Sequence, residues 1–190
     1  MRYPKNHKEN VRQQLLLESG SHAKQHGFAA SGVDALAGAA GLTTGSLYKH
    51  FDNKDALFSA LISAELGKTK RRYDGLKHGD YIAIQKILTS YLSMNHVHEP
   101  ANGCPVPPLA SEVARSSDEV KRAFEAGIVE LKNAVTDITG SSSTAWTLMA
   151  QNVGAVMIAR AMLHDKTKRE ILAAVRMAGV DLLSSAQGTT

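Results

Sequence analysis

The sequence predicts an all-α protein of about nine helices, and three observations support that prediction. The alternating apolar and polar runs that half-buried strands require are missing from the chain. Apolar residues instead recur every three or four positions, as along Val120, Phe124, Ile128, Leu131, Val135 and Ile138. Four of the five prolines lie between Pro100 and Pro108 and the fifth is Pro4, so helices are permitted on both sides of that segment.

The chain has 190 residues, of which 43% are hydrophobic, so it is long enough for one domain or for two small domains that share a core. Lys and Arg outnumber Asp and Glu by 22 to 18, a balance that permits an anionic partner without requiring one. Cys104 is the single cysteine, which excludes an internal disulfide and suits a reducing compartment. The polar N-terminus and the polar residues within the most apolar stretch, 145–163, predict a cytoplasmic protein without a membrane span.

Turn signals divide the N-terminal part of the chain into four expected helices. Glycines separate the first three, and an Asp-Asn pair offers an N-cap for the fourth. These helices are expected over residues 8–26, 33–40, 44–50 and from 54 onward, with Gly27, Gly32, Gly41 and Asp52-Asn53 at the breaks. Five later helices are expected over residues 81–95, 109–115, 118–138, 141–164 and 168–185.

The two short helices form the pattern of a helix-turn-helix motif over about residues 31–50. Small residues would let the two helices pack closely, and leucines would seal a small core between them: Ala37, Ala40, Leu36, Leu42 and Leu47. The second short helix exposes hydroxyl groups and a cation, which suit hydrogen bonds to phosphates and base edges in the major groove of DNA. These side chains belong to Thr44, Ser46, Tyr48, Lys49 and His50.

Five segments of the chain resemble the N-terminal domain of TetR/AcrR-type (tetracycline-repressor-like) transcriptional regulators. They are Gly27-Phe28, Val33-Asp34-Ala35-Leu36-Ala37, Ala40-Gly41-Leu42, Gly45-Ser46-Leu47-Tyr48-Lys49-His50-Phe51 and Lys54-Asp55-Ala56-Leu57. The resemblance covers about residues 8–68. It implies a DNA-binding domain over residues 1–53 and a ligand-binding and dimerisation domain over residues 54–190, joined through the helix that begins near Lys54.

The same resemblance implies a set of DNA-binding residues: Ser31, Gly32, Thr43, Thr44, Gly45, Ser46, Tyr48, Lys49, His50 and Lys54. Tyr48 and Lys54 correspond to phosphate anchors, and Gly45 would allow the helix to approach DNA closely. Three positions depart from the family's pattern, and one of them is Ala23, which stands where a large aromatic residue often fills the core of the first helix. Gly32 stands where Ser or Thr usually caps the second helix, and Thr44 replaces a frequent Lys. The residues alone leave Lys49 and His50 open between DNA contact and a solvated helix face.

The C-terminal half contains a helix that is apolar on nearly every side, over residues 141–164. Such a helix must be covered on several faces, so we expect it to pack against a second copy of the chain, although a central core helix has the same pattern. A mostly apolar ligand pocket is expected among Met94, His98, Cys104, Trp146, Met149 and Asn152.

Cys104 lies in a Gly-Cys-Pro segment that resembles one found in a subgroup of these regulators. At the start of a helix the thiolate is favoured, so Cys104 is a candidate redox sensor. A small buried cysteine that only packs is the interpretation that we favour. The loose spacing of His96, His98 and Cys104 gives no reason to expect a metal.

These observations predict a ligand-responsive DNA-binding transcriptional regulator, a repressor that binds a palindromic operator as a homodimer and is released by a small-molecule effector. Double-stranded DNA, the effector and a second copy of the chain are the expected partners, with no membrane and no cofactor. The chain has no phosphate-binding glycine loop, nucleophile elbow or carboxylate cluster, so we do not expect an enzyme. The alternative is a helical ligand or thiol-redox sensor that does not bind DNA, which the departures at Gly32 and Thr44 favour.

Overall fold

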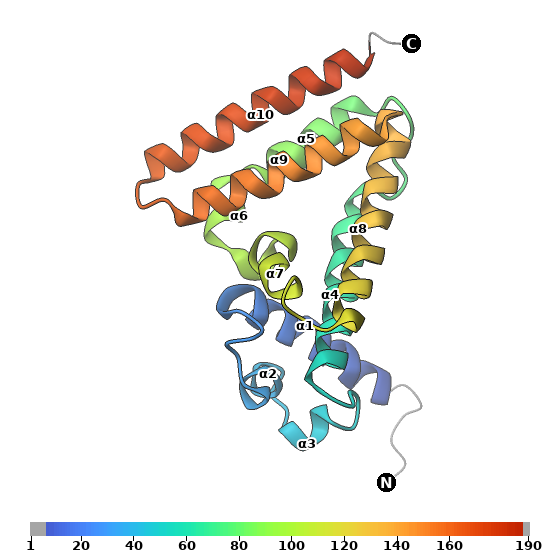
Figure 1. The fold of residues 1–190 in the computed structure, drawn as a ribbon, viewed down its shortest axis with the longest axis vertical. Coiled ribbons are helices and arrows are strands. Elements are labelled where there is room, and N and C mark those ends of the chain that lie inside the picture. Colours follow the sequence, from blue (N-terminus) through green and yellow to red (C-terminus); the bar gives the residue numbers. More distant parts are fainter. Residues whose placement is uncertain (1–6, 188–190) are drawn as a thin grey trace. The chain divides into compact units, whose positions relative to one another are not determined.

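The structure is a computed structural model that describes residues 7–187 of the chain. Every regular element in that range is helical, which confirms the all-α prediction. The described residues form ten α-helices (Figure 1): α1 (His7–His26), α2 (Val33–Ala39), α3 (Thr44–Leu47), α4 (Lys54–Lys70), α5 (Tyr81–Tyr91), α6 (Met94–His98), α7 (Val106–Val113), α8 (Asp118–Thr139), α9 (Ser142–Ala161) and α10 (Asp165–Gln187). Two short 3₁₀ helices, η1 (Arg71–Tyr73) and η2 (Pro100–Asn102), follow α4 and α6.

The tenth helix arises because the helix expected over residues 81–95 is divided at Leu92 and Ser93. The Ser93 hydroxyl accepts a hydrogen bond from the His96 N–H, 3.2 Å away, and so caps α6. The predicted start of α7 at residue 109 was also wrong. α7 begins at Val106, because prolines in a first turn remove no intrahelical hydrogen bond.

The chain divides into two compact units. The first comprises the chain up to Leu66 together with Ala101–Gly127, and the second comprises Gly67–Pro100 and the chain from Ile128 onward. The division therefore falls within α4 and within α8, each of which contributes to both units. The boundary expected from the sequence, between a DNA-binding domain that ends at residue 53 and a ligand-binding domain that begins at residue 54, remains a prediction.

The first unit is built on α1, whose buried face contacts α2 and α4. Two polar side chains of α1 fix α2: the Ser19 hydroxyl donates to the Leu36 carbonyl at 2.8 Å, and the Gln14 amide donates to the Ala40 carbonyl at 2.9 Å. The Phe28 ring, just beyond α1, stacks on the Phe58 ring of α4 with centroids 4.0 Å apart. The core also contains the buried residues Leu15, Leu16, Ala23, Leu57, Leu61 and Ile62.

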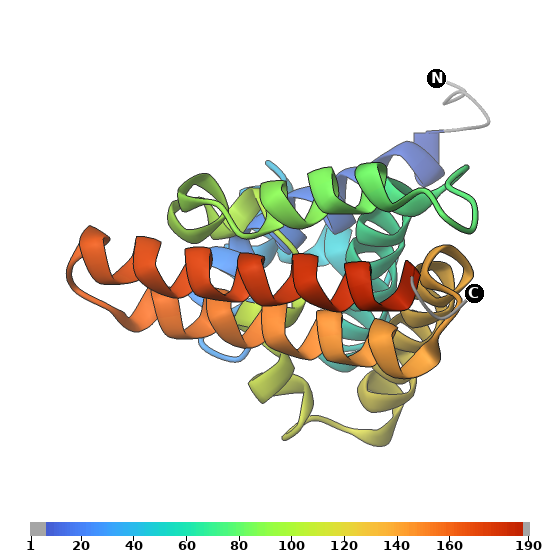
Figure 2. The same cartoon turned by 90° about the horizontal axis from the view of Figure 1, so that it is seen from above.

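In the second unit α9 and α10 lie side by side and antiparallel, with α5 alongside α10 (Figures 1 and 2). Their core consists of Ile84, Leu88, Val135, Ile138, Ala145, Leu148 and Leu183. Two arginines fasten the α5–α6 junction to this pair of helices. Arg160 donates to the His96 carbonyl at 2.7 Å, and Arg176 donates to the Leu92 carbonyl. None of the helices in residues 7–187 is long and apolar enough to cross a membrane.

Candidate nucleic-acid interface

The turn between α2 and α3 has a helix-ending geometry that requires Gly41. Its φ of 67° is in the left-handed region, which residues other than glycine rarely adopt. The Leu42 N–H reaches back to the Ala37 carbonyl at 3.1 Å, and the Gly41 N–H donates to the Gly38 carbonyl at 2.9 Å. α3 then begins at once, because the Thr43 hydroxyl caps it by accepting from the Ser46 N–H at 3.2 Å. This turn fixes the direction of α3 relative to α2.

α3 and the two residues after it combine one buried side chain with several exposed positions. Leu47 is fully buried, whereas Gly45 and Lys49 are exposed and Tyr48 is 48% exposed. Thr44 is half-buried, and its hydroxyl donates a hydrogen bond to the Asp34 carboxylate of α2. The Thr44 side chain therefore joins α3 to α2, a structural role that was not expected from the sequence.

Among residues 7–187, no neighbour of position 45 requires a glycine there. A Cβ atom built there would have one neighbour within 4 Å, the Thr43 hydroxyl oxygen at 4.0 Å, which is an ordinary contact distance. Gly45 has no positive φ either, unlike Gly41. The space beside Gly45 is open, so a partner could approach the backbone of α3 closely at this point.

Lys54, the first residue of α4, donates hydrogen bonds to the loop that precedes α2. Its ammonium lies 2.7 Å from the Ser31 carbonyl oxygen and 3.3 Å from that of Ala29, and it sits 5.0 Å from the centroid of the Phe28 ring. These bonds use two of its three N–H donors. Ser31 itself is buried and donates from its hydroxyl to the Gly27 carbonyl at 2.6 Å.

His50 lies in positive surroundings that the sequence did not reveal. Burial lowers the pKa of His50 below its usual value of 6.5, and the charges of Lys8, Arg12 and Lys49 lower it further, against a smaller opposite effect of Glu9. Its Nδ1 atom is buried and has no hydrogen-bond partner among the described residues. Lys8 and Arg12 of α1 therefore lie, like Lys49, close enough to His50 for their charges to act on it. The sequence carried no signal for this, because the proximity depends on the packing of α1.

The predicted ligand-pocket residues are spread over both units. Met94 and His98 belong to α6, Trp146, Met149 and Asn152 belong to α9, and Cys104 belongs to the first unit. Trp146 is 44% exposed whereas Asn152 is 6% exposed, so these two residues lie on different faces of α9. The Asn152 Oδ1 atom has no hydrogen-bond partner among the described residues. Cys104 is buried.

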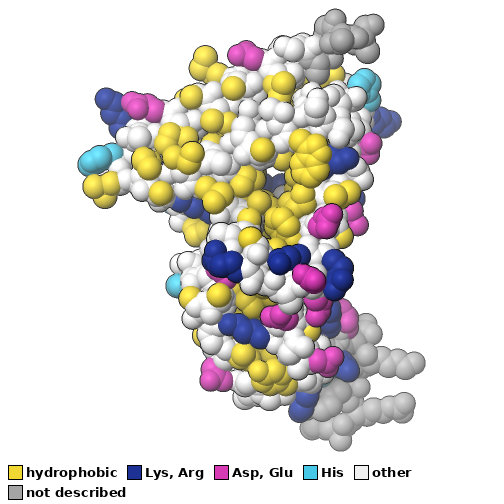
Figure 3. All heavy atoms as spheres, in the orientation of Figure 1, with side chains coloured by type: hydrophobic (Ala, Val, Ile, Leu, Met, Phe, Trp, Pro, Cys, Tyr) yellow, Lys and Arg dark blue, Asp and Glu magenta, His cyan; other side chains and the backbone are white. Residues whose placement is uncertain are grey.

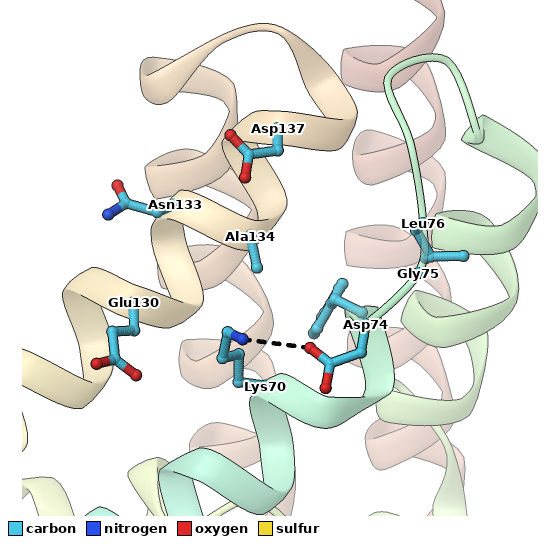
Figure 4. Close-up of a pocket in the computed structure, with 9 residues that line it drawn as sticks. Lys70, Asp74, Gly75, Leu76, Glu130, Asn133, Ala134 and Asp137 are labelled. Atoms are coloured by element: carbon cyan, nitrogen blue, oxygen red, sulfur yellow. Dashed lines mark hydrogen bonds and ion pairs between the residues drawn. The ribbon is translucent and has the colours of Figure 1, made fainter.

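A groove of about 510 Å³ lies elsewhere in the second unit and contains none of those residues (Figure 4). It is lined by the end of α4 and the turn after it on one side and by α8 on the other. The Lys70 ammonium and the Asp74 carboxylate form an ion pair of 3.2 Å at its edge. The lining residues are Lys70, Tyr73, Asp74, Gly75, Leu76, Glu130, Asn133, Ala134 and Asp137.

Known proteins resemble this chain both in the sequence of its helix-turn-helix region and in its fold. Residues 22–61 match the sequence model for bacterial regulatory proteins of the tetR family. None of the curated protein sequences matches the chain.

Solved structures match almost the full length. The reduced form of NemR from E. coli has a TM-score of 0.76 and 20% identity over 90% of this chain and 95% of its own. A TetR-family regulator from Cytophaga hutchinsonii has a TM-score of 0.75 and 21% identity, covering 97% and 98%. FadR from Bacillus subtilis, in complex with stearoyl-CoA, has a TM-score of 0.68 and 14% identity, covering 92% and 98%. Residues 22–61 therefore carry the sequence pattern of the tetR family, and the chain has the fold of solved TetR-family regulators along nearly its full length.

Proposed function

We propose that the chain is a ligand-responsive transcriptional repressor that binds a palindromic operator as a homodimer. The observation that carries this proposal is the presentation of α3. Leu47 anchors the helix, Gly45, Tyr48 and Lys49 are exposed, and the charges of Lys8 and Arg12 of α1 act on the adjacent His50. An open backbone, a phenol and three cations suit a helix that enters a major groove between two phosphate chains.

The ten residues implied by the sequence contribute in different ways under this proposal. Tyr48, Lys49 and the third N–H of Lys54 would contact phosphates, while Gly45 and Ser46 would face base edges. Thr43, Thr44, Ser31 and Gly32 would act chiefly by shaping the turns, because the Thr44 and Ser31 hydroxyls are already bonded inside the unit. His50 would lie close enough to DNA for a phosphate to change its protonation.

A homodimer would cover the exposed apolar face of α9 and α10, the surface formed by Trp146, Met157, Ile158 and Met177. These side chains are between 42% and 69% exposed. Figure 3 shows hydrophobic side chains along the part of the molecule that α9 and α10 occupy in Figure 1. Small residues on α9, including Gly154 with no atom within 4 Å of a Cβ built there, would allow close approach of a second copy. A two-fold dimer is also what a palindromic site requires.

The effector would bind in the second unit, where Asn152 offers a buried carbonyl oxygen without a partner among the described residues. FadR, a structural relative, is seen with stearoyl-CoA. α4 begins with Lys54 in the first unit and ends in the second, so a shift of this helix would link the effector to the DNA contacts. A coupling of about 1–3 kcal/mol would weaken operator binding roughly 5- to 150-fold.

We further propose that the protein acts in the cytoplasm, where bacterial DNA lies, and that it catalyses no reaction. Cys104 would serve as a packing residue, since its side chain is only 6% exposed.

Selection of binding sites from random-sequence DNA by the purified protein tests the proposal. The expected result is a palindromic consensus whose binding weakens for Tyr48→Phe and Lys54→Ala, and not for Lys86→Ala, which removes an exposed cation from α5. Binding that depends on salt but selects no consensus would reduce the surface to a basic patch. No binding by the reduced, ligand-free protein would instead favour a helical sensor that does not bind DNA.

A further inference from the structure

A carboxylate from α7 holds the loop between α1 and α2. The two oxygens of Glu112 accept hydrogen bonds from consecutive backbone N–H groups, Phe28 at 3.2 Å and Ala29 at 2.6 Å. All three residues belong to the first compact unit. Hydrogen bonds to an ionised carboxylate are roughly twice as strong as neutral ones, and neither N–H belongs to a helix. Glu112 thereby fixes a loop whose own backbone would leave these donors to water.

Gly27 is shaped for this contact as well as for the end of α1. Its φ of 84° is in the left-handed region, and a Cβ atom built there would lie 2.9 Å from the Glu112 Oε1 atom. A side chain at position 27 would push the carboxylate away from the loop. The absence of a side chain and the approach of Glu112 therefore depend on one another.

The segment that carries Glu112 is fastened to α1 at a second point. The Lys24 ammonium donates to the Gly103 carbonyl at 3.1 Å and pairs with the Glu65 carboxylate of α4 at 2.5 Å. The Lys24 side chain is fully buried in this arrangement. Residues 103–112 are thus tied to α1 near one end and to the following loop at the other, which makes α7 a strap across the end of α1.

Glu112 and Lys54 bind the same loop, Glu112 through the N–H groups of the loop and Lys54 through its carbonyl groups. Glu112 takes the N–H groups of Phe28 and Ala29, while Lys54 binds the carbonyl oxygens of Ala29 and Ser31. A negative group and a positive group therefore fix two sides of one short segment, and that segment leads directly into Gly32 and α2. A displacement of α7 would move the loop and, with it, the partners that position the Lys54 ammonium.

From this geometry we propose that Glu112 is a positioning residue for DNA binding, and that α7 is the element through which movement of the chain around residues 103–112 reaches Lys54. The proposal rests on the DNA-binding function proposed above. Glu112 touches no DNA in this role. It holds the loop so that Lys54 and the start of α2 are already in place when DNA arrives.

The test compares Glu112→Ala with two matched variants in the full-length protein. Glu125→Ala removes an exposed carboxylate from α8, and Val113→Ala removes buried apolar contact from the neighbouring residue of α7. One readout is the amide hydrogen exchange of Phe28 and Ala29 without DNA, followed by NMR. The other is affinity for the DNA site that the wild-type protein selects from random sequences.

In Glu112→Ala we expect these two amides to exchange at least about tenfold faster and the affinity to fall on the order of tenfold. Glu112→Gln keeps one acceptor oxygen, so its values should lie between those of the wild type and Glu112→Ala. The Val113→Ala and Glu125→Ala variants should stay within about twofold of wild type in affinity.

Unchanged exchange in Glu112→Ala would overturn the proposal, as would faster exchange with unchanged affinity. An equal loss of affinity in Val113→Ala would reduce Glu112 to a general stabiliser of the unit. If the wild-type protein selects no DNA, it is the proposed function that fails, and the positioning role falls with it. That outcome is distinct from a wild type that selects DNA and a Glu112→Ala variant that binds it equally well.

Discussion

The ammonium of Lys54 lies 2.7 Å from the carbonyl oxygen of Ser31, so the first residue of α4 is bonded to the residue that precedes the cap of α2. A lysine that would contact phosphate thus also holds the loop on which the helix-turn-helix begins. The two roles can be separated, because they affect different quantities.

Lys54→Ala should lower both the stability of the protein and its affinity for DNA. The loss of bonds to two carbonyl groups should reduce the free energy of unfolding by about 1 kcal/mol, as measured by urea denaturation. The slope of log affinity against log salt should decrease in magnitude by about two, since each protomer of the proposed dimer loses one phosphate contact. Lys49→Ala is the matched control: Lys49 is exposed, so the slope should change and the stability should not. Equal stability of the two variants would contradict the structural role of Lys54.

Gly45→Ala and Gly41→Ala should have opposite effects on stability. Alanine at position 45 has room and restricts the unfolded chain, so it should raise the free energy of unfolding by up to about 1 kcal/mol. Alanine at position 41 must adopt a φ near 67°, which should cost about 1–2 kcal/mol. Thermal denaturation measures both. A stable Gly45→Ala variant with much weaker DNA binding would show that the glycine serves the approach of DNA, and unchanged binding would remove Gly45 from the interface.

Acidification should destabilise the protein in part through His50. The pKa of His50 is lowered in the folded state, mainly by burial and then by nearby cations, so the unfolded chain binds the proton first as the pH falls. The contribution of His50 is complete above the unfolded value near 6.5 and is lost as the pH falls through that value toward the folded pKa. The free energies of unfolding of the wild type and of His50→Gln, measured by urea denaturation at several pH values, isolate the contribution of His50. An NMR titration gives the pKa of His50 directly. A folded pKa at or above 6.5 would refute this account.

Bound DNA should shift that titration the other way. A phosphate near His50 favours the imidazolium form and raises its pKa, so binding takes up a proton. The affinity of the wild type for its selected site should therefore increase between about pH 7.5 and pH 6, and this increase should be smaller in His50→Gln. The same pH dependence in both proteins would place His50 away from the phosphates.

Cys104 should react slowly in the folded protein. Because its side chain is only 6% exposed, an aromatic disulfide reagent should modify it on the order of a hundredfold more slowly than in the urea-unfolded chain. Cys104→Ala should retain DNA affinity and lose about 1 kcal/mol of stability, as expected of a small buried side chain. Rapid modification accompanied by release of DNA would instead identify a thiol sensor.

Ile158→Lys should convert the proposed dimer into monomers. Ile158 is 54% exposed on the face of α9 proposed to meet a second copy, and a two-fold interface would bury the new charge twice. Ile82→Lys is the matched control, because Ile82 of α5 is 73% exposed and lies outside the proposed interface. Sedimentation velocity should show a monomer for the first variant and a dimer for the second. If both variants sedimented as dimers, or both as monomers, the result would contradict the proposed interface on α9.

The parts of the fold that sequence predicted well depend on local signals. Gly41 and the Thr43 cap mark the turn between α2 and α3 within a few residues, and the apolar spacing along α8 is regular. The break at Ser93 was missed because apolar residues continue on both sides of it and a single serine decides the cap. The start of α7 differs from the predicted one because a cluster of prolines indicates a helix break, whereas the first turn of a helix accepts proline.

The site was predictable to the extent that its residues are consecutive in the sequence. The sequence predicts a helix over residues 44–50 with exposed polar side chains, and the structure confirms its start, whereas α3 ends at Leu47 and His50 is half-buried. The proximity of Lys8 and Arg12 to His50 and the grip of Glu112 on Phe28 and Ala29 could not be read, because packing alone brings these residues together. The hydrogen bond from Thr44 to Asp34 was missed for the same reason.

The tie between Glu112 and the loop after α1 spans more than eighty residues of sequence. During synthesis the N-terminal helices leave the ribosome well before α7 has been made. The helix-turn-helix and the loop before it therefore cannot reach their final structure until the chain has grown past residue 113. A fragment cut after Leu66 would lack the strap, the partner of two backbone N–H groups and the carbonyl that Lys24 binds. Grafting this DNA-binding head onto another regulator would therefore require α7 to travel with it.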